Sequence, residues 1–198
     1  TPATIDADAK PLYDYFMSIA KGNEKQAQSD DSPLKHIDFL HASVRSGNLS
    51  YVTELLDKVE FTEIEILDVF LRACFLNHEA IARHVHKLNP WVIQKDFEQR
   101  GDSAMTGACR RGDLGIVKLF VEDGFDVKTF GESSVEYAIS LGHNDIAIYL
   151  FEHGLNIHEN NGMHLRIACR YNKTDIAKYL LEHGVDAQSK DNEPIYRA

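Results

Sequence analysis

The sequence predicts an all-α solenoid of stacked helix–turn–helix units, chiefly because the chain repeats itself. The segment from Tyr137 to Ala147 is echoed thirty residues later, from Ile167 to Ala177. Both segments then continue alike, as Tyr-Leu-Phe-Glu-His-Gly and Tyr-Leu-Leu-Glu-His-Gly. A fixed period of this length is typical of repeat proteins, whose small units bury their apolar faces by stacking on one another. Such solenoids commonly present an extended binding surface.

A small residue recurs at the same place in each repeat and sets the register. We call these places the anchor positions, and the spacings between them are 30, 35, 30, 30 and 30 residues. Four positions after an anchor comes a Gly or Asn, which predicts a turn because both residues adopt the left-handed conformation that ends a helix. The anchors are Ser43, Ala73, Ala108, Ala138, Ala168 and Ala198. The turn residues are Gly47, Asn77, Gly112, Gly142 and Asn172.

The residues after each turn predict a second helix. Asn48, Asp113 and Asn144 are suited to cap its first turn. Apolar residues such as Ile176 and Leu180 then recur at helical spacing. A glycine predicts the end of this helix in the last three complete repeats. These glycines are Gly124, Gly154 and Gly184.

The first two repeats depart from this pattern. They hold Val59 and Asn89 where the later repeats have the closing glycine. The 35-residue spacing adds five residues to the stretch 88–101, where Pro90 ends the second helix and we predict a loop. The loop carries the single tryptophan, Trp91, which we expect to pack over the neighbouring apolar seam. An exposed interface anchor is the alternative interpretation of Trp91.

Several segments carry the resemblance to a known family. Asp38–Ser43, Ser133–Ala138 and Glu193–Ala198 align with the ankyrin pattern T-P-L-H-x-A, and Gly142-His143 matches its G-H pair. Residues 37–198 therefore resemble an ankyrin-repeat solenoid of about five full repeats and a partial sixth. The resemblance implies short loops in place of long β-turn fingers, because the repeats are shorter than usual and mostly lack the D-G pair. Repeats of this style are similar to those abundant in giant DNA viruses.

Residues 1–36 differ in composition from the repeats. Apolar residues at helical spacing predict a short amphipathic helix near residues 9–21, and a polar stretch after it predicts a linker. The helix either caps the first repeat, as the ends of such arrays require, or belongs to a domain upstream of Thr1. Both interpretations stay open, and so does the possibility that the chain is part of a longer array.

Composition narrows the classes of function. The chain has 198 residues, 43% of them hydrophobic, and a net charge of −10. This charge disfavours nucleic acid and anionic membranes as partners of the surface as a whole. No apolar run in the sequence approaches the roughly 20 residues that a membrane-spanning helix needs. We therefore expect a monomeric protein in the cytoplasm of its source or of a host cell.

Cysteine and histidine side chains fill repeated structural places. Cys74, Cys109 and Cys169 each follow an anchor directly, so we expect small buried residues, not metal ligands. Several histidines also recur in register, and the resemblance implies that some of them bond neighbouring loops. These are His41, His78, His143, His153 and His183. Since the H-E-x-x-H motif, phosphate loops and nucleophile elbows are missing from the sequence, we expect no catalytic residue, metal or cofactor.

The two residues before each turn carry the main functional signal. The resemblance implies that they end the first helix of each repeat and face a concave groove. We call them the pre-turn positions: Arg45, Ser46, Phe75, Leu76, Arg110, Arg111, Ser140, Leu141, Arg170 and Tyr171. They hold four of the nine arginines of the chain and no Asp or Glu. Arginine mixed with aromatic residues is favoured at interfaces, although arginine is also mildly favourable at any helix C-terminus.

We therefore expect a non-enzymatic protein-interaction module that binds an acidic, or mixed acidic and apolar, protein partner in its groove. The alternative is the substrate-recognition domain of a larger enzyme, pathogen effector or ubiquitin-ligase adaptor whose active domain lies outside this chain. A purely structural spacer is a third interpretation.

Overall fold

Helices account for all the regular structure in the described part of the chain. The computed structural model describes residues 36–100, 104–158 and 162–186, which fall into two compact units divided between Gln99 and Arg100. Within these ranges no strand is present, so the predicted all-α fold is confirmed. The helix and linker predicted for residues 1–36 lie outside these ranges except for His36, and so does the partial sixth repeat at Ala198.

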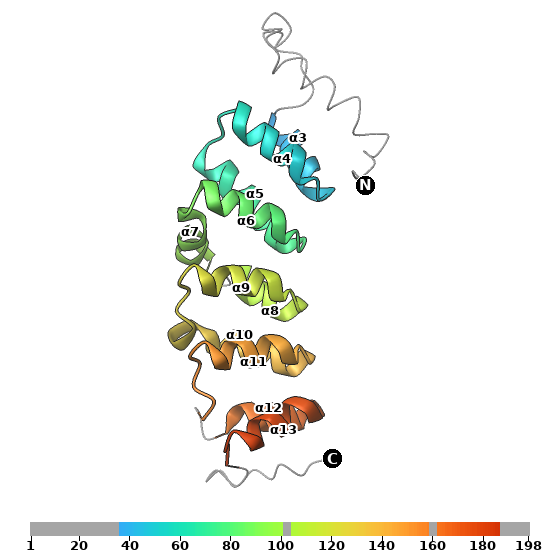
Figure 1. Cartoon of the computed structure of the whole chain (residues 1–198), viewed down its shortest axis with the longest axis vertical. Coiled ribbons are helices and arrows are strands. Elements are labelled where there is room, and N and C mark those ends of the chain that lie inside the picture. The colour runs from blue at the N-terminus through green and yellow to red at the C-terminus, as the bar shows by residue number, and fades with distance from the viewer. Residues whose placement is uncertain (1–35, 101–103, 159–161, 187–198) are drawn as a thin grey trace, which may run out of the picture. The chain divides into compact units, whose positions relative to one another are not determined.

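Unit 1 contains two stacked helical hairpins and one further helix. The first hairpin is α3 (His36–Arg45) with α4 (Leu49–Lys58), and the second is α5 (Glu63–Phe75) with α6 (Glu79–Leu88). The first helices α3 and α5 pack together, as do the second helices α4 and α6 (Figure 1). Helix α7 (Trp91–Arg100) follows the second hairpin.

Unit 2 contains three stacked hairpins. They are α8 (Ala104–Arg111) with α9 (Leu114–Glu122), α10 (Val127–Leu141) with α11 (Asn144–Glu152), and α12 (Met163–Arg170) with α13 (Thr174–Glu182). Helix α10 packs against both α8 and α12, and α11 packs against both α9 and α13 (Figure 1). Within the unit, the first helices therefore form one layer and the second helices form the other.

The described anchor positions are buried in the first helices. Ser43 is 3% exposed, and the four described alanine anchors are fully buried. The buried Ser43 hydroxyl donates a hydrogen bond to the Phe39 carbonyl at 2.9 Å, which satisfies a polar group where water is excluded. The alanine anchors in the described ranges are Ala73, Ala108, Ala138 and Ala168. Small side chains at these points let neighbouring helices approach, as the repeat register predicted.

The predicted turn residues all adopt the left-handed conformation. Their φ angles lie between 53° at Asn172 and 89° at Gly142. The residue that follows the turn in the next repeat packs over the turn glycine of the preceding repeat. A Cβ atom added to Gly112 would lie 2.6 Å from the His143 ring, and one added to Gly142 would lie 3.0 Å from Lys173 Nζ. The turn conformation favours glycine or asparagine at this position, and at Gly112 the His143 ring also leaves no room for a Cβ atom.

The stretch 88–101 is mostly helical, so the predicted loop was wrong. Pro90 ends α6, but a proline is also compatible with the start of another helix, where its missing N–H group costs no hydrogen bond. Val92 and Ile93 of α7 are buried and supply the apolar contacts that a short helix needs. Trp91 is the first residue of the helix and is half-buried. This degree of burial lies between the two interpretations, a residue packed over the apolar seam and an exposed interface anchor.

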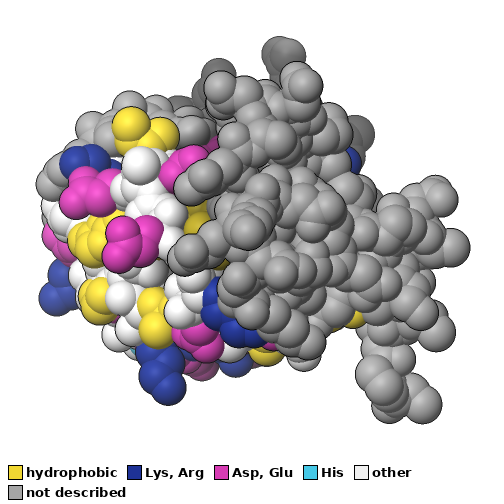
Figure 2. All heavy atoms as spheres, turned by 90° about the horizontal axis from the view of Figure 1, so that it is seen from above, with side chains coloured by type: hydrophobic (Ala, Val, Ile, Leu, Met, Phe, Trp, Pro, Cys, Tyr) yellow, Lys and Arg dark blue, Asp and Glu magenta, His cyan; other side chains and the backbone are white. Residues whose placement is uncertain are grey.

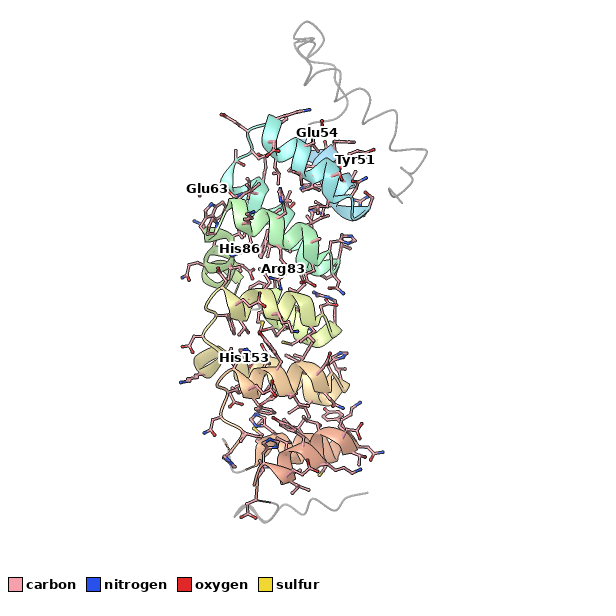
Figure 3. The ribbon with its side chains drawn as sticks, in the orientation of Figure 1. Tyr51, Glu54, Glu63, Arg83, His86 and His153 are labelled. Carbon is pink, nitrogen blue, oxygen red and sulfur yellow. The ribbon has the colours of Figure 1, made fainter. Side chains whose placement is uncertain are left out.

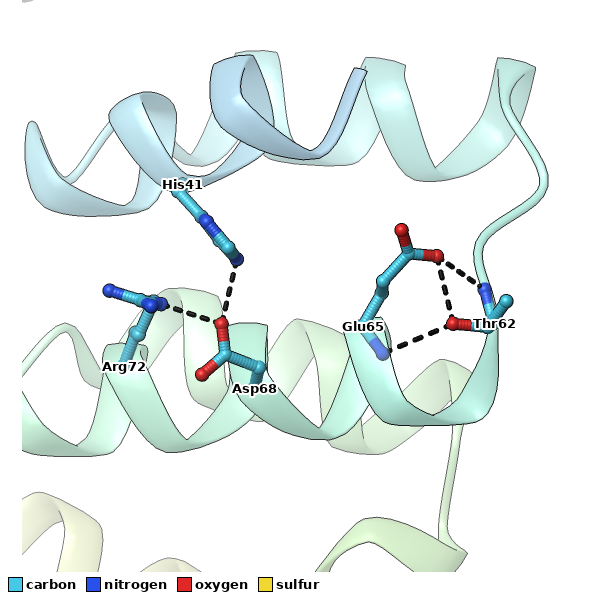
Figure 4. A network of polar contacts seen from close by, with 5 residues as sticks. All are labelled: His41, Thr62, Glu65, Asp68 and Arg72. Atoms are coloured by element: carbon cyan, nitrogen blue, oxygen red, sulfur yellow. Dashed lines mark hydrogen bonds and ion pairs between the residues drawn. The ribbon is translucent and has the colours of Figure 1, made fainter. Parts of the chain in front are cut away.

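The helix caps agree only in part with the prediction. Asn48 caps α4 through a hydrogen bond from the Tyr51 backbone N–H. Asn144 is instead the first residue of α11, and Asp113 occupies the cap position of α9 without a capping hydrogen bond. Helix α5 begins with a capping box, in which Thr62 and Glu65 bond to each other's backbone N–H groups (Figure 4).

Replacing Gly112 by alanine should destabilise the protein more than replacing Gly124. The φ angles are 85° and 91°, so each alanine carries a left-handed backbone cost of about 1–2 kcal/mol. Only at Gly112 does the new Cβ also collide with His143, since no other described heavy atom lies within 4 Å of a Cβ at Gly124. Urea unfolding followed by circular dichroism measures both losses. Equal losses would contradict a role for the His143 contact in shaping the turn.

Candidate functional site

The pre-turn positions lie at one end of the first-helix layer in each unit. Arg45 is the last residue of α3, and Phe75 is the last residue of α5. In unit 2, Arg111, Leu141 and Arg170 end α8, α10 and α12. Because successive first helices pack side by side within a unit, their ends place these pairs next to one another. The predicted location at the ends of the first helices is therefore observed in both units.

Large apolar side chains are exposed at these positions. Phe75 is 68% exposed, and Leu141 and Tyr171 are each 51% exposed. Leu76 is also exposed, at 39%. Isolated exposed apolar residues are common on any protein surface, but several on adjoining helix ends are typical of interaction sites.

Unit 2 holds an arginine stacked on an aromatic ring. The Arg110 Cζ atom lies 5.2 Å from the centre of the Tyr137 ring, which belongs to the next first helix, α10. A cation over an aromatic ring at this distance is attracted by the negative face of the ring. Tyr137 is itself 42% exposed, so this pair adds both charge and apolar area to the surface. Tyr137 precedes an anchor and was not among the predicted residues.

Arg111 is neutralised within the chain. Its Nε atom donates to the Asp113 carboxylate at 2.6 Å, and the Asp113 side chain is only 8% exposed. The nearly buried carboxylate therefore takes up the charge of Arg111 instead of capping α9. Of the two adjacent arginines at the end of α8, Arg110 is the one that remains available to a partner.

Arg45, Arg110 and Arg170 have no acidic partner within the part of the chain that the structure describes. Arginines elsewhere in unit 1 behave differently: Arg72 pairs with Asp68 and Arg83 pairs with Glu79, each at 2.7 Å. The contrast is informative because the net charge of −10 makes carboxylates abundant. Seen from above, acidic, basic and apolar side chains are interspersed over the described part of the surface (Figure 2). Arg45, Arg110 and Arg170 therefore add unpaired positive charge at the helix ends, as exposed lysines such as Lys128 and Lys178 do elsewhere in the described ranges.

Two of the histidines brace the pre-turn backbone. His78 Nε2 lies 3.4 Å from the Arg45 carbonyl oxygen, and His143 Nε2 lies 3.2 Å from the Arg110 carbonyl oxygen. Each histidine therefore links its own repeat to the preceding one, as the resemblance implied. These contacts fix the direction of the helix ends that carry Arg45 and Arg110.

The other repeated histidines have structural contacts of their own. The His153 and His183 rings stack on Tyr149 and Tyr179 with centroid distances of 3.9 and 4.0 Å. In each case Nδ1 also lies 2.8 Å from the carbonyl oxygen of the same tyrosine. Among the described side chains, no group of three or more His, Cys, Asp or Glu residues is arranged to hold a metal ion.

His41 takes part in a network between α3 and α5 (Figure 4). Its Nε2 atom lies 2.8 Å from Asp68 Oδ2, and Arg72 Nε lies 2.7 Å from the same oxygen. Burial lowers the pKa of His41 below its ordinary value, and the Arg72 charge lowers it further. Asp68 and Asp38 oppose that shift without reversing it. The network therefore favours neutral His41 and is a structural contact between two repeats.

The cysteines are free thiols. Cys74 and Cys109 are fully buried, as predicted, whereas Cys169 is only partly buried. Burial raises the pKa of the Cys109 thiol to about 12, although a hydrogen bond with Ser134 acts in the opposite direction. Burial also raises the pKa of Cys169. A thiol held protonated is a poor nucleophile and a poor metal ligand.

Sequence reasoning missed Asp113 and Tyr137 as parts of the site. Asp113 stands two residues after Arg111, on the other side of the turn. We had interpreted Asp113 as a helix cap. Tyr137 stands three residues before Ser140, so helical spacing places it beside the end of α10. The sequence shows that both residues are close to a pre-turn position, but only the side-chain geometry shows which contact each of them makes.

The repeats of this chain match those of known ankyrin repeat proteins. A family model for ankyrin repeats in three copies matches residues 70–161, and a single-repeat ankyrin model matches residues 160–189. A putative ankyrin repeat protein of Acanthamoeba polyphaga mimivirus is 32% identical over 119 residues, which are 60% of this chain and 18% of the viral protein. The matched segment therefore spans less than a fifth of that relative.

The fold is also similar to that of a solved structure. The crystal structure of the human ASB11 ankyrin repeat domain matches with a TM-score of 0.57 and 22% identity, over 74% of this chain and 69% of that domain. This likeness supports the repeat architecture. Separately, no helix in the described ranges is long and apolar enough to cross a membrane.

The lowered pKa of His41 predicts a pH dependence of stability. The unfolded chain binds a proton at His41 near pH 6.5, whereas the folded chain binds it only at lower pH. Stability from this residue is therefore complete above the unfolded pKa and is lost as the pH falls toward the folded pKa. Between pH 7.5 and 5, the free energy of unfolding of His41→Asn should fall less than that of the parent chain. His158→Asn, at an exposed position, is the control, and parallel curves for parent and His41→Asn would contradict the assignment.

Burial and raised pKa values predict an order of thiol reactivity. At pH 8, iodoacetamide should modify Cys169 first and leave Cys74 and Cys109 largely unmodified in the native chain. All three should react at similar rates in concentrated urea. Mass spectrometry of digested protein measures each site, and early modification of Cys109 in native protein would contradict its buried position.

Proposed function

This chain belongs to the ankyrin repeat family, and we propose that it binds an acidic protein partner through its pre-turn positions. Ankyrin repeats are generally non-catalytic modules for protein–protein interaction. The chemistry of the partner follows from what the helix ends offer. They combine cations without carboxylate partners and large exposed apolar side chains on rigid helices.

The single observation that carries the proposal is that Arg110 lies over the Tyr137 ring and has no acidic partner among the described residues. Arg110 is exposed, its Cζ atom lies over the Tyr137 ring at 5.2 Å from the ring centre, and it has no acidic partner in the described part of unit 2. A preorganised arginine loses less side-chain entropy when it binds a carboxylate. Arg170 provides a second exposed cation at the end of α12, which is separated from α8 by α10 in the same layer. A partner segment with carboxylates spaced to meet both would match this surface.

Apolar contacts would supply the remaining affinity. Leu141 and Tyr171 are half-exposed in unit 2, and Phe75 is more exposed still in unit 1. Burying a side chain of this size contributes roughly 1.5–3 kcal/mol. We therefore expect the acidic residues of the partner to alternate with aliphatic or aromatic ones, since each unit offers both kinds of contact.

A favourable position at a helix C-terminus is the simplest competing explanation for these arginines. That effect is worth about 0.3–1 kcal/mol and requires neither stacking nor exposed apolar neighbours. It accounts equally for Arg111, whose charge is taken up by Asp113. The competing explanation therefore accounts for an arginine at the end of a helix, but not for the exposed Tyr137 ring under Arg110.

The cellular location is also a proposal. The three cysteines are free thiols, and unpaired thiols persist in reducing compartments. We propose a cytoplasmic location, in the source cell or in a host.

Charge reversal at Arg110 and Arg170 should weaken partner binding without loss of fold. Two charge-assisted contacts at about 1.5 kcal/mol or more each predict a loss of roughly 100-fold or more for the double variant Arg110→Glu/Arg170→Glu. The matched control is Lys128→Glu/Lys178→Glu, which changes the net charge equally at exposed positions outside the pre-turn set. Affinity capture with the full chain and mass spectrometry identify the partner, and calorimetry with that partner gives the affinities.

Circular dichroism melts establish that both variants remain folded. Equal affinity of the arginine variant and the parent would contradict the proposed surface. An equal loss in the arginine and lysine variants would show that only net charge matters.

A further inference from the structure

Unit 1 contains a hollow at the opposite end of its hairpins from the pre-turn positions. The hollow has a volume of about 580 Å³ and lies between the end of α4, the chain that leads into α5, and the end of α6. Its apolar lining is incompletely covered, since none of these side chains belongs to the buried core. The apolar lining residues are Leu56, Val59, Phe61, Ile66 and Leu88. The hollow is open to solvent, and polar residues line it beside the apolar ones, namely Asp57, Lys58, Glu60 and Asn89.

In unit 2, a glycine and an apolar residue close the equivalent end of a hairpin. Gly154 follows α11 with a φ of 108° and turns the chain back. The next residue, Leu155, is therefore only 4% exposed and would contact a Cβ added to Gly131 at 3.3 Å. Gly184 and Val185 repeat this arrangement after α13, where Val185 is also 4% exposed. The apolar residue after the glycine acts as a plug.

The first two repeats lack both parts of this closure. Val59 stands at the place of the glycine and leaves α4 in an extended conformation, with φ −125° and ψ 131°. The place of the plug is taken by the exposed residues Glu60 and Pro90. In the second repeat, Ile66 stands where Gly131 stands in its own repeat of unit 2, and Pro90 stands at the corresponding plug position, so the apolar Ile66 side chain is left to line the hollow. The hollow therefore follows from the sequence and is not an irregularity of one side chain.

The rim of the hollow is acidic. Asp57 and Glu60 line it, both are exposed, and neither has an ion-pair partner within residues 36–100. Lys58, the single cation in the lining, is held by Glu54 one helical turn earlier on α4. Glu63 begins α5 at the same end of the hairpins (Figure 3). The charge at this site is thus opposite in sign to that of the pre-turn positions.

We propose that this hollow is a second docking site, which takes an aliphatic or aromatic side chain of a partner protein flanked by lysine or arginine residues. The apolar anchor takes the place of the missing plug against Phe61, Ile66 and Leu88. The flanking cations pair with Asp57 and Glu60. This site is independent of the pre-turn positions, and it gives the chain two surfaces of opposite charge.

Two variants of the full chain separate the roles of shape and charge. Val59→Gly/Glu60→Leu restores the glycine and plug found at Gly154 and Leu155. The added leucine should fill the hollow and raise the melting temperature by about 4 °C or more, since it buries apolar area. Asp57→Asn/Glu60→Gln keeps the hollow but removes the rim charge. A lower melting temperature for the plug variant would contradict our explanation of the hollow.

The test uses peptides and amide chemical shifts of the ¹⁵N-labelled chain. The probe is acetyl-Gly-Lys-Lys-Leu-Phe-Lys-Lys-Gly-amide. Control peptides replace every Lys by Glu, or Leu-Phe by Ser-Asn. At 2 mM probe we expect shifts at the amides of residues 56–61, 66 and 88–89. Binding should be roughly tenfold weaker in the charge variant and absent in the plug variant.

Several outcomes would overturn the proposal. They are no shifts at these amides, equal shifts with either control peptide, and unchanged binding to the plug variant. Shifts at these amides that appear with increasing protein concentration and no peptide would assign the hollow to a second copy of the chain.

Discussion

The left-handed turn between the two helices of each repeat is the constraint on which the rest of the structure depends. It reverses the chain after the first helix. The turn thereby determines which residues form the exposed C-terminal end of that helix. The next repeat then packs a side chain over the turn, as His143 does over Gly112 and Lys173 does over Gly142. A single backbone conformation thus sets both the hairpin and its contact with the neighbour. The pre-turn residues are exposed because the turn leaves them no helix to pack against.

Position in the repeat also separates the side chains that pack within the stack from those that are exposed at the helix ends. Side chains that recur in register are used within the stack: the anchors are buried, His78 and His143 bond to the preceding repeat, and His153 stacks on its own tyrosine. Side chains that differ between repeats are exposed at the helix ends. Asp113 shows that the division is not complete, since it pairs with Arg111 at one of the exposed helix ends. Charge available to a partner is therefore smaller than the composition of the pre-turn positions suggests.

The repeat period, together with the recurring small residues and turn residues, made most of the fold predictable from the sequence. Anchors, turns and helix ends depend on local rules for small residues and for positive φ, and these rules are legible in one sequence. Features that depend on a distant or competing partner were not legible. Asp113 looked like a helix cap because its competing partner, Arg111, is recognised only from side-chain geometry. Pro90 looked like the start of a loop because the burial of Val92 and Ile93, which stabilises α7, is a tertiary effect.

Recognition of protein by the ends of the first helices is the central claim, and a crystal structure of the full chain bound to its partner tests it most directly. We predict partner carboxylates within hydrogen-bond distance of Arg110 and Arg170, with an apolar partner side chain against Leu141 or Tyr171. We also predict that Arg111 stays paired with Asp113 in the complex. A partner bound to the second helices α9, α11 and α13, with Arg110 and Arg170 left in solvent, would contradict the account.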